Sequence, residues 1–189
     1  MRKSKTEKMV VTALLASFSY ILILLDFSIL PTFGWLKLDF SDVPILIGTF
    51  ILGPLAGITI AFIRSTLNFM MSGADILSLI GNLTGFIASV IFLFPIYYME
   101  KKESTNKNLL IGMGLSSFSL IVFMSIANYF VITPLYMSVL GMDFGIPIRD
   151  MVLFGIIPFN VIKCIAVNLV FFVTYKKLLP SIERKRRLI

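Results

Sequence analysis

The chain has 189 residues, of which 58% are hydrophobic and 14% charged, with a net charge of +7 and a mean hydropathy of +0.96. A soluble domain of this size would expose far more apolar surface than water tolerates, so the composition excludes the soluble classes and predicts an integral membrane protein. Membrane topology and anionic lipid account for the positive charge, and no nucleic-acid partner is needed to explain it.

The apolar stretches are long enough for spanning helices of about 20 residues and too continuous for the alternating strands of a barrel. The apolar segment 9–25 follows four basic residues but precedes no small-x-small cleavage site. We therefore interpret it as part of a first helix, at residues 7–25, rather than as a secretory signal. Residues 42–71 as one helix would be about 45 Å long, against a hydrocarbon core of roughly 30 Å. Gly53-Pro54 offers a break, which predicts helices at 42–52 and 54–71. Further helices are expected at 76–99, 109–137 and 151–178.

The basic residues test this count of crossings. Six crossings with both termini in the cytoplasm place there thirteen of the seventeen cations, namely Arg2, Lys3, Lys5, Lys8, Lys101, Lys102, Lys107, Lys176, Lys177, Arg184, Lys185, Arg186 and Arg187. Merging the helices at 42–52 and 54–71 would move the later cations outside, against the positive-inside rule. We therefore predict an all-α membrane protein in which residues 1–189 form one bundle of six transmembrane helices. The short helix at 42–52 should tilt, thin the bilayer or be shielded by its neighbours.

The sequence also excludes most enzyme chemistry. The chain has no histidine and one cysteine, Cys164, which rules out histidine triads, Cys–His pairs, multi-ligand zinc sites and an internal disulfide. The phosphate-binding motif G-x-x-x-x-G-K-[ST] is absent and the loops are too short for a nucleotide-binding domain, so the chain would need a partner or a gradient for energy. The aspartates are all expected at the outer face or in its loops: Asp26, Asp39, Asp42, Asp75, Asp143 and Asp150. We expect neither an enzyme nor a metal site.

Lys163 is the most costly residue in the sequence, since it lies inside an apolar helix where a charge costs roughly 2.5–3.5 kcal/mol. Asn160 lies three residues earlier, on the same helical face. Because no acid on the neighbouring helices is expected at matching depth, we predict that this pair faces a ligand. Asn82 and Asn128 also lie in the outer halves of their helices, although interhelical hydrogen bonding is the ordinary role of a single asparagine. Arg64 is expected to snorkel or to bond helix carbonyls, in a structural role.

The first outer loop, residues 26–42, is long and rich in aromatic residues, with Phe27, Phe33, Trp35 and Phe40. Such a loop either lies on the membrane interface, with Trp35 as an anchor, or folds over a cavity as a lid. It emerges on the same side as the outer asparagines. Aromatic cover over a few convergent polar groups is the usual construction of a small-molecule site.

Four segments carry a family resemblance: Leu38-Asp39-Phe40-Ser41-Asp42-Val43-Pro44, Leu52-Gly53-Pro54-Leu55-Ala56-Gly57, Gly81-Asn82 and Pro158-Phe159-Asn160-Val161-Ile162-Lys163. These segments resemble the substrate-binding S component of energy-coupling factor (ECF) vitamin transporters, most closely the riboflavin-specific kind. The resemblance covers essentially the whole chain. The resemblance implies that riboflavin binds from outside, between the first loop and the outer parts of the last three helices. It also implies a transmembrane coupling (T) subunit and two cytoplasmic ATPase (A) subunits as partners, with riboflavin as the transported ligand and no cofactor.

The resemblance further implies a set of ligand-binding residues. The flat ring would lie among Leu38, Phe40, Tyr129 and Tyr136, and hydrogen bonds would come from Asn128, Asn160 and Lys163, with Asp39 and Asn82 completing the site. The docking mark of the family is Ala-x-x-x-Ala on the first helix. Here the four-residue spacing gives two pairs of small residues, Thr12/Ala16 and Ala13/Ser17, and packing within the bundle is an equal alternative for either pair.

Other interpretations remain open at this point. The chain could be an S component for thiamine or biotin, or a structural membrane subunit whose buried polar residues only hold helices together. A self-sufficient secondary transporter would be expected to show an inverted repeat and two interrupted helices, whereas only the interruption at Gly53-Pro54 is seen.

Overall fold

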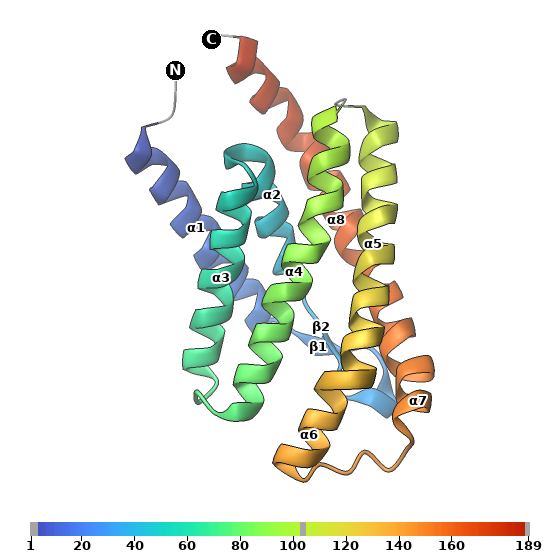
Figure 1. The fold of residues 1–189 in the computed structure, drawn as a ribbon. Coiled ribbons are helices and arrows are strands. Elements are labelled where there is room, and N and C mark those ends of the chain that lie inside the picture. Colours follow the sequence, from blue (N-terminus) through green and yellow to red (C-terminus); the bar gives the residue numbers. More distant parts are fainter. Residues whose placement is uncertain (1–3, 103–104, 188–189) are drawn as a thin grey trace.

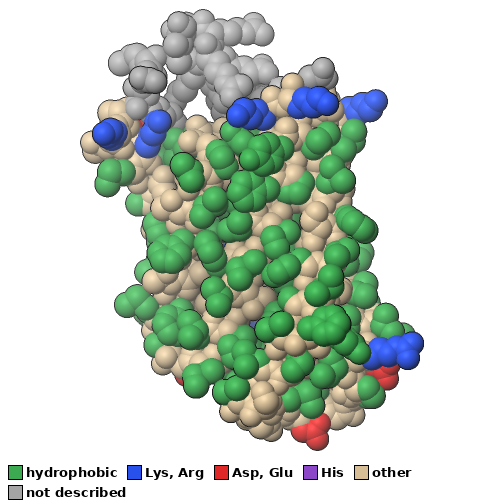
Figure 2. All heavy atoms as spheres, in the orientation of Figure 1, with side chains coloured by type: hydrophobic (Ala, Val, Ile, Leu, Met, Phe, Trp, Pro, Cys, Tyr) green, Lys and Arg blue, Asp and Glu red, His purple; other side chains and the backbone are tan. Residues whose placement is uncertain are grey.

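The computed structural model describes residues 4–102 and 105–187 and shows a bundle of roughly antiparallel helices with both termini at one end (Figure 1). We call this the terminal end and the opposite end the loop end. Lysine and arginine side chains gather at the terminal end, while hydrophobic side chains cover the middle of the face in Figure 2. Two cations of the topology argument, Arg2 and Lys3, lie outside the described residues.

The helices are α1 (Lys5–Leu24), α2 (Asp42–Leu52), α3 (Pro54–Met71), α4 (Ile76–Lys102), α5 (Asn106–Ala127), α6 (Thr133–Leu140), α7 (Ile148–Met151) and α8 (Ile157–Arg187). Two π-helical turns make longer helices of the last four: η2 (Asn128–Ile132) joins α5 to α6, and η3 (Val152–Ile156) joins α7 to α8. Five of the resulting helices in the described chain are long and apolar enough to cross a membrane. The shorter α2 has 11 residues.

The break between α2 and α3 lies at Gly53-Pro54, as the sequence predicts. Gly53 has φ of 103°, a conformation that glycine adopts without strain, and Pro54 begins α3 where no backbone donor is needed. Helix α2 packs against α1, α3, α4 and α8, and most of its side chains are buried. Shielding by neighbours, rather than exposure to lipid, therefore accommodates this short helix.

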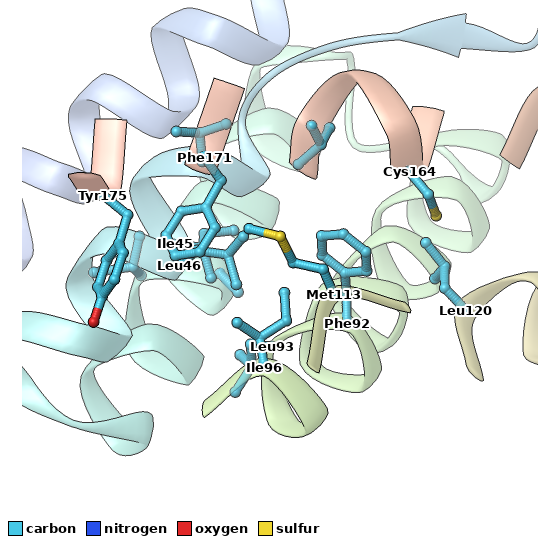
Figure 3. Packing of buried hydrophobic residues seen from close by; sticks show 14 of the residues in the cluster. Ile45, Leu46, Phe92, Leu93, Ile96, Met113, Leu120, Cys164, Phe171 and Tyr175 are labelled. Atoms are coloured by element: carbon cyan, nitrogen blue, oxygen red, sulfur yellow. The ribbon is translucent and has the colours of Figure 1, made fainter. Parts of the chain in front are cut away.

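The main hydrophobic core joins α2, α4, α5 and α8 (Figure 3). Its largest fully buried side chains include Ile45 and Leu46 of α2, Phe92 of α4 and Phe171 of α8. Because α8 runs from the loop end to the terminal end, Phe171 lies closer to the terminal end than Lys163 does. The apolar core thus fills the bundle between the polar residues described below and the terminal end.

The segment between α1 and α2 is folded. It contains a two-stranded antiparallel sheet, β1 (Phe27–Ser28) and β2 (Lys37–Leu38), and a short 3-10 helix, η1 (Pro31–Phe33). Lys37 Nζ lies 3.0 Å from Asp26 Oδ1, an ion pair that links the two ends of this hairpin. In the structure the first loop comprises residues 25–41, because Asp42 already belongs to α2.

Aromatic contacts seat the first loop on the start of the last helix. Phe33 is buried against a hydrophobic cluster formed by α7 and η3. A Cβ atom at Gly155 would lie 2.9 Å from the Phe33 ring, so glycine is what allows this close approach. Trp35 packs on Phe33 and on Phe144, with ring centroids 5.5 and 5.2 Å away. The loop is therefore held by apolar packing as well as by the charges described below.

Gly112 allows the close contact between α4 and α5, because a Cβ there would lie 2.9 Å from Ile96 Cα. We expect Gly112→Ala to destabilise the protein by about 1–3 kcal/mol through overpacking. Gly114, on the same helix, has open space around it, since a Cβ placed there would meet no atom within 4 Å. Gly114→Ala should therefore leave stability unchanged or raise it by up to about 1 kcal/mol. Thermal loss of helical circular dichroism in detergent measures both variants, and equal effects would contradict the packing argument.

Candidate functional site

A cavity of about 340 Å³ opens among the helices in the half of the bundle towards the loop end. Polar groups from the first loop and from four helices, α2, α3, α4 and α8, line it. The lining residues are Ile23, Asp39, Asp42, Arg64, Ser65, Asn68, Ser72, Ser78, Gly81, Asn82, Gly85, Ala88, Ser89, Leu120, Met124, Phe159, Asn160 and Lys163. Its volume is within the range of roughly 300–1,000 Å³ that is typical of small-molecule sites.

Lys163 has two acidic partners on one side of this cavity. Its Nζ atom donates a hydrogen bond to Asp39 Oδ2 at 3.1 Å and lies 3.8 Å from Asp42 Oδ2. The Lys163 side chain is 20% exposed, whereas both aspartate side chains are 9% exposed. The ammonium group therefore lies between the two carboxylates on one side and the cavity on the other.

Arg64 on α3 completes the polar cluster. Its Nη1 atom donates to Ser41 Oγ at 2.7 Å and to Asp42 Oδ1 at 3.1 Å. Ser41 in turn donates to Asp39 Oδ1 from its hydroxyl, and from its backbone N–H at 2.9 Å. Contacts thus run from Arg64 through Ser41 to Asp39, on to Lys163, and back through Asp42 to Arg64. We call these five residues the ionic ring.

Local sequence explains why the two aspartates reach the interior. The Asp39 side chain accepts the Ser41 N–H, the two-residue turn that aspartate favours. Asp42 is the first residue of α2, where the positive end of the helix dipole stabilises a carboxylate. Ser19 of α1 donates to the backbone oxygen of Ser41 at 2.6 Å. The chain therefore turns inward directly after β2 and enters α2 within the bundle.

The charges in the cavity wall balance. Two acids, Asp39 and Asp42, face two bases, Arg64 and Lys163. Burial by itself raises the pKa of the Asp39 carboxyl, but the charges of Lys163 and Arg64 and the hydrogen bonds from Ser41 outweigh it and lower that pKa from 3.8 to about 2. This stabilisation is present above the unfolded pKa of the carboxyl and is lost as the pH falls through about 2.

These contacts correct one sequence prediction, on Lys163, and part of a second, on Arg64. We expected no acid at the depth of Lys163, because Asp39 and Asp42 were assigned to the outer face; the inward turn brings both carboxylates to the ammonium. We expected Arg64 to snorkel or to bond helix carbonyls, but it is 3% exposed and pairs with Asp42. It does bond one helix carbonyl, Gly85, at 3.4 Å.

Four of the predicted ligand-binding residues line the cavity: Asp39, Asn82, Asn160 and Lys163. Asn82 on α4 accepts a hydrogen bond from Asn68 on α3 at 2.8 Å. The Asn160 amide nitrogen donates to Ile156 O at 2.8 Å, so the amide oxygen is the acceptor that this side chain can offer to the cavity. The structure therefore brings together residues that are 124 positions apart in the chain.

The other five do not belong to the described cavity lining. Leu38 is buried and Phe40 packs against the main core. Asn128 donates to Met124 O of its own helix. Tyr129 is 43% exposed. Tyr136 comes nearest, because its hydroxyl oxygen would lie 3.6 Å from a Cβ atom at Gly81, which itself lines the cavity.

Several lining residues were not among the predicted site residues, chiefly Asp42, Arg64, Ser65, Asn68 and Ser89. Arg64 and Asn68 are four residues apart on α3, a spacing that places both on one helical face. That spacing, together with a charged residue inside an apolar helix, is the sequence signal for the part of the cavity wall that α3 forms. Within residues 4–102 and 105–187, no group of three or more His, Cys, Asp or Glu side chains is placed to hold a metal ion.

The small residues of α1 divide between two faces. Ala16 is 1% exposed and belongs to the main core, and Thr12 is half-buried. Ala13 and Ser17 are exposed. The Thr12/Ala16 pair thus contributes to packing within the bundle, and the Ala13/Ser17 pair forms a free small-residue surface.

Comparison with known proteins agrees with this architecture. The family model described as "ECF transporter, substrate-specific component" matches residues 7–175. "Riboflavin transporter FmnP" of Bacillus subtilis (strain 168) is 36% identical over 184 residues, covering 96% of this chain and 97% of the relative. "Riboflavin transporter RibU" of Staphylococcus aureus (strain TCH60) is 33% identical over 181 residues, covering 95% and 94%.

A solved structure of the S component of a bacterial ECF transporter has the same fold, with a TM-score of 0.80 at 31% identity. The match covers 94% of this chain and 98% of the other. The family model and the structural match both extend over most of the chain. This multi-pass membrane protein belongs to the family of ECF transporter substrate-specific components.

Proposed function

We propose that this protein binds riboflavin in the cavity and delivers it inward as the S component of an ECF importer. The observation that carries the proposal is the cavity wall, in which balanced charges and several amide groups converge on about 340 Å³. Two relatives similar over nearly the whole chain are named riboflavin transporters, which supports this vitamin over thiamine or biotin.

The chemistry of the wall suits a neutral, polar ligand. Lys163 has ammonium hydrogens beyond the one donated to Asp39, and Asn82 and Asn160 add amide groups. Riboflavin offers ring carbonyls and ribityl hydroxyls to such groups, and each donor that it satisfies avoids a penalty of about 1–3 kcal/mol. We place its flat ring against Leu120, Met124 and Phe159, the apolar side chains of the lining on α5 and α8.

We further propose that the terminal end faces the cytoplasm and that the first loop acts as a lid at the outer side. Lys101 and Lys102 at the end of α4 and Lys176 and Lys177 in α8 support this orientation, because basic residues favour the cytoplasmic side. Vitamin captured at the loop end would pass inward while the protein is docked on a coupling subunit and two ATPases. The small-residue surface at Ala13 and Ser17 is the part of α1 that we assign to docking.

The visible absorption spectrum of the purified protein tests the ligand. We expect a flavin to co-purify from cells grown with riboflavin, or added riboflavin to bind to ligand-free protein in detergent. A colourless protein that binds thiamine or biotin instead would contradict the vitamin assignment. Failure to bind any of the three would support a structural subunit. Uptake that persists without the partner ATPases would indicate a secondary transporter.

Substitutions in the wall test the site. Asn160→Ala removes an amide from the cavity, and Lys163→Met removes an ammonium donor, so each should weaken riboflavin binding by roughly 5- to 150-fold, the equivalent of about 1–3 kcal/mol. Asn168→Ala is the matched control: Asn168 is an amide of the same helix that donates instead to Ser117 Oγ of α5 at 2.9 Å. The control should retain affinity in an equilibrium titration of intrinsic or flavin fluorescence. Equal losses in all three variants would argue against the cavity as the binding site.

Bulk on the small-residue surface of α1 tests docking. Ala13→Trp or Ser17→Trp should prevent close approach of a partner helix and abolish riboflavin uptake, while binding by the isolated protein is retained. Phe18→Trp is the control, because Phe18 is already large and is 51% exposed on the same helix. Co-purification with the coupling subunit and riboflavin uptake by cells are the measurements. Normal assembly of the Ala13 and Ser17 variants would place docking elsewhere.

A further inference from the structure

We infer that Arg64 is a positioning residue: by occupying Asp42, it keeps Lys163 on Asp39 and so holds the first loop against the cavity. This inference deepens the proposed function, and its ligand readout rests on riboflavin binding. The position of the first loop can be measured without a ligand, so the inference about Arg64 and the proposed riboflavin binding can fail separately.

Two acids compete for the one ammonium group of Lys163. Lys163 Nζ lies 3.1 Å from Asp39 Oδ2 and 3.8 Å from Asp42 Oδ2, so both carboxylates are within reach. Arg64 donates to the other oxygen of Asp42 at 3.1 Å, and the Ser89 hydroxyl donates to that same oxygen. With Asp42 satisfied in this way, Lys163 takes the nearer position to Asp39.

Removing Arg64 would change this division. Asp42 is 6% exposed, and a buried carboxylate without a cation is strongly unfavourable. The nearest remaining cation is Lys163, which would move towards Asp42 and leave Asp39. Asp39 would then lose its hydrogen bond with Lys163. Asp39 follows β2, and this hydrogen bond ties the first loop to α8.

Arg64 also sets the direction of the Ser41 hydroxyl. Arg64 donates to Ser41 Oγ at 2.7 Å, so this oxygen acts as an acceptor towards α3 and its own hydrogen is directed to Asp39. Arg64 thereby orients a second contact with Asp39. The contacts of Arg64 with Ser41 and with Asp42 thus both strengthen the hydrogen bonding of the Asp39 carboxylate.

A lysine could not make the same set of contacts. The guanidinium of Arg64 spans Ser41 and Asp42 with Nη1 and Ser89 with Nη2, the last at 3.1 Å. A lysine carries its donors on one point and cannot bridge groups on two sides. Arg64→Lys should therefore have an effect between those of the wild type and Arg64→Met, since it keeps the charge near Asp42 but loses the two-sided hydrogen bonding of the guanidinium.

The chain contains its own reporter of the loop. Trp35 is the only tryptophan in the sequence and lies in the first loop, packed on Phe33 and Phe144. It is 48% exposed, so its fluorescence can change in either direction when the loop moves. Quenching by acrylamide measures how accessible Trp35 is to a small molecule in solution, in the ligand-free, full-length protein.

The experiment compares Arg64→Met, Asp42→Asn, the double variant Arg64→Met/Asp42→Asn and Arg64→Lys with the wild type. We expect Arg64→Met to raise Trp35 quenching and to weaken riboflavin binding by about tenfold or more, a coupling typical of residues in one network. Asp42→Asn removes the competitor for Lys163, so the loop should stay in place. The double variant should recover quenching and affinity to within about threefold of the wild type. Asn168→Leu, a substitution of a half-buried polar residue outside the ionic ring, should leave Trp35 quenching unchanged.

The outcomes separate positioning from a general structural role. A plain salt bridge predicts equal damage from Arg64→Met and Asp42→Asn, and a direct ligand donor predicts no recovery in the double variant; either result would overturn the inference. If Arg64→Met fails to fold, Asp42→Asn and Arg64→Lys still decide, because greater quenching in Asp42→Asn than in Arg64→Lys contradicts it. If the wild type binds no riboflavin, the proposed function fails, and Trp35 quenching still tests the role of Arg64.

Discussion

The need to neutralise buried charge is the constraint on which this structure depends. The four charged residues of the ionic ring lie within the bundle, and each would cost several kcal/mol if left without a partner. The ionic ring satisfies them together, and in doing so it joins the end of the first loop, the start of α2, α3 and α8. This explains why the short α2 lies at the centre of the bundle: its first residue is a carboxylate that pairs with the arginine of α3 and lies 3.8 Å from the lysine of α8.

Local signals predicted the helices well because their causes are local. Continuous apolar runs identify segments that must satisfy their backbone in lipid, and Gly53-Pro54 marks a break wherever it occurs. The ends were less accurate: α4 and α8 continue to Lys102 and Arg187, since a helix can extend beyond the apolar part of its sequence. The cost of Lys163 likewise predicted that a polar partner must exist.

The identity of that partner could not be predicted in the same way. Depth was assigned from position along the chain, which placed Asp39 and Asp42 outside the bundle. In the structure the turn at Asp39 and Ser41 carries both carboxylates inward, and this turn depends on contacts with α1, α3 and α8 that are remote in sequence. The two π-helical turns had a similar effect. Each changes the helical phase of the residues after it, so Tyr136, which follows η2, does not lie on the face that an uninterrupted α-helix would give it.

The ring also limits which ligands are compatible with a closed loop. An ammonium group has three donors, so a neutral ligand can accept a hydrogen bond from Lys163 while Asp39 keeps its own. Binding of such a ligand and attachment of the loop then reinforce each other, because both favour the same position of Lys163. An anionic ligand differs, since its charge would compete with Asp39 for Lys163 and would leave a buried carboxylate unpaired. For the proposed riboflavin site, the charge balance that holds the first loop in place therefore also favours a neutral ligand.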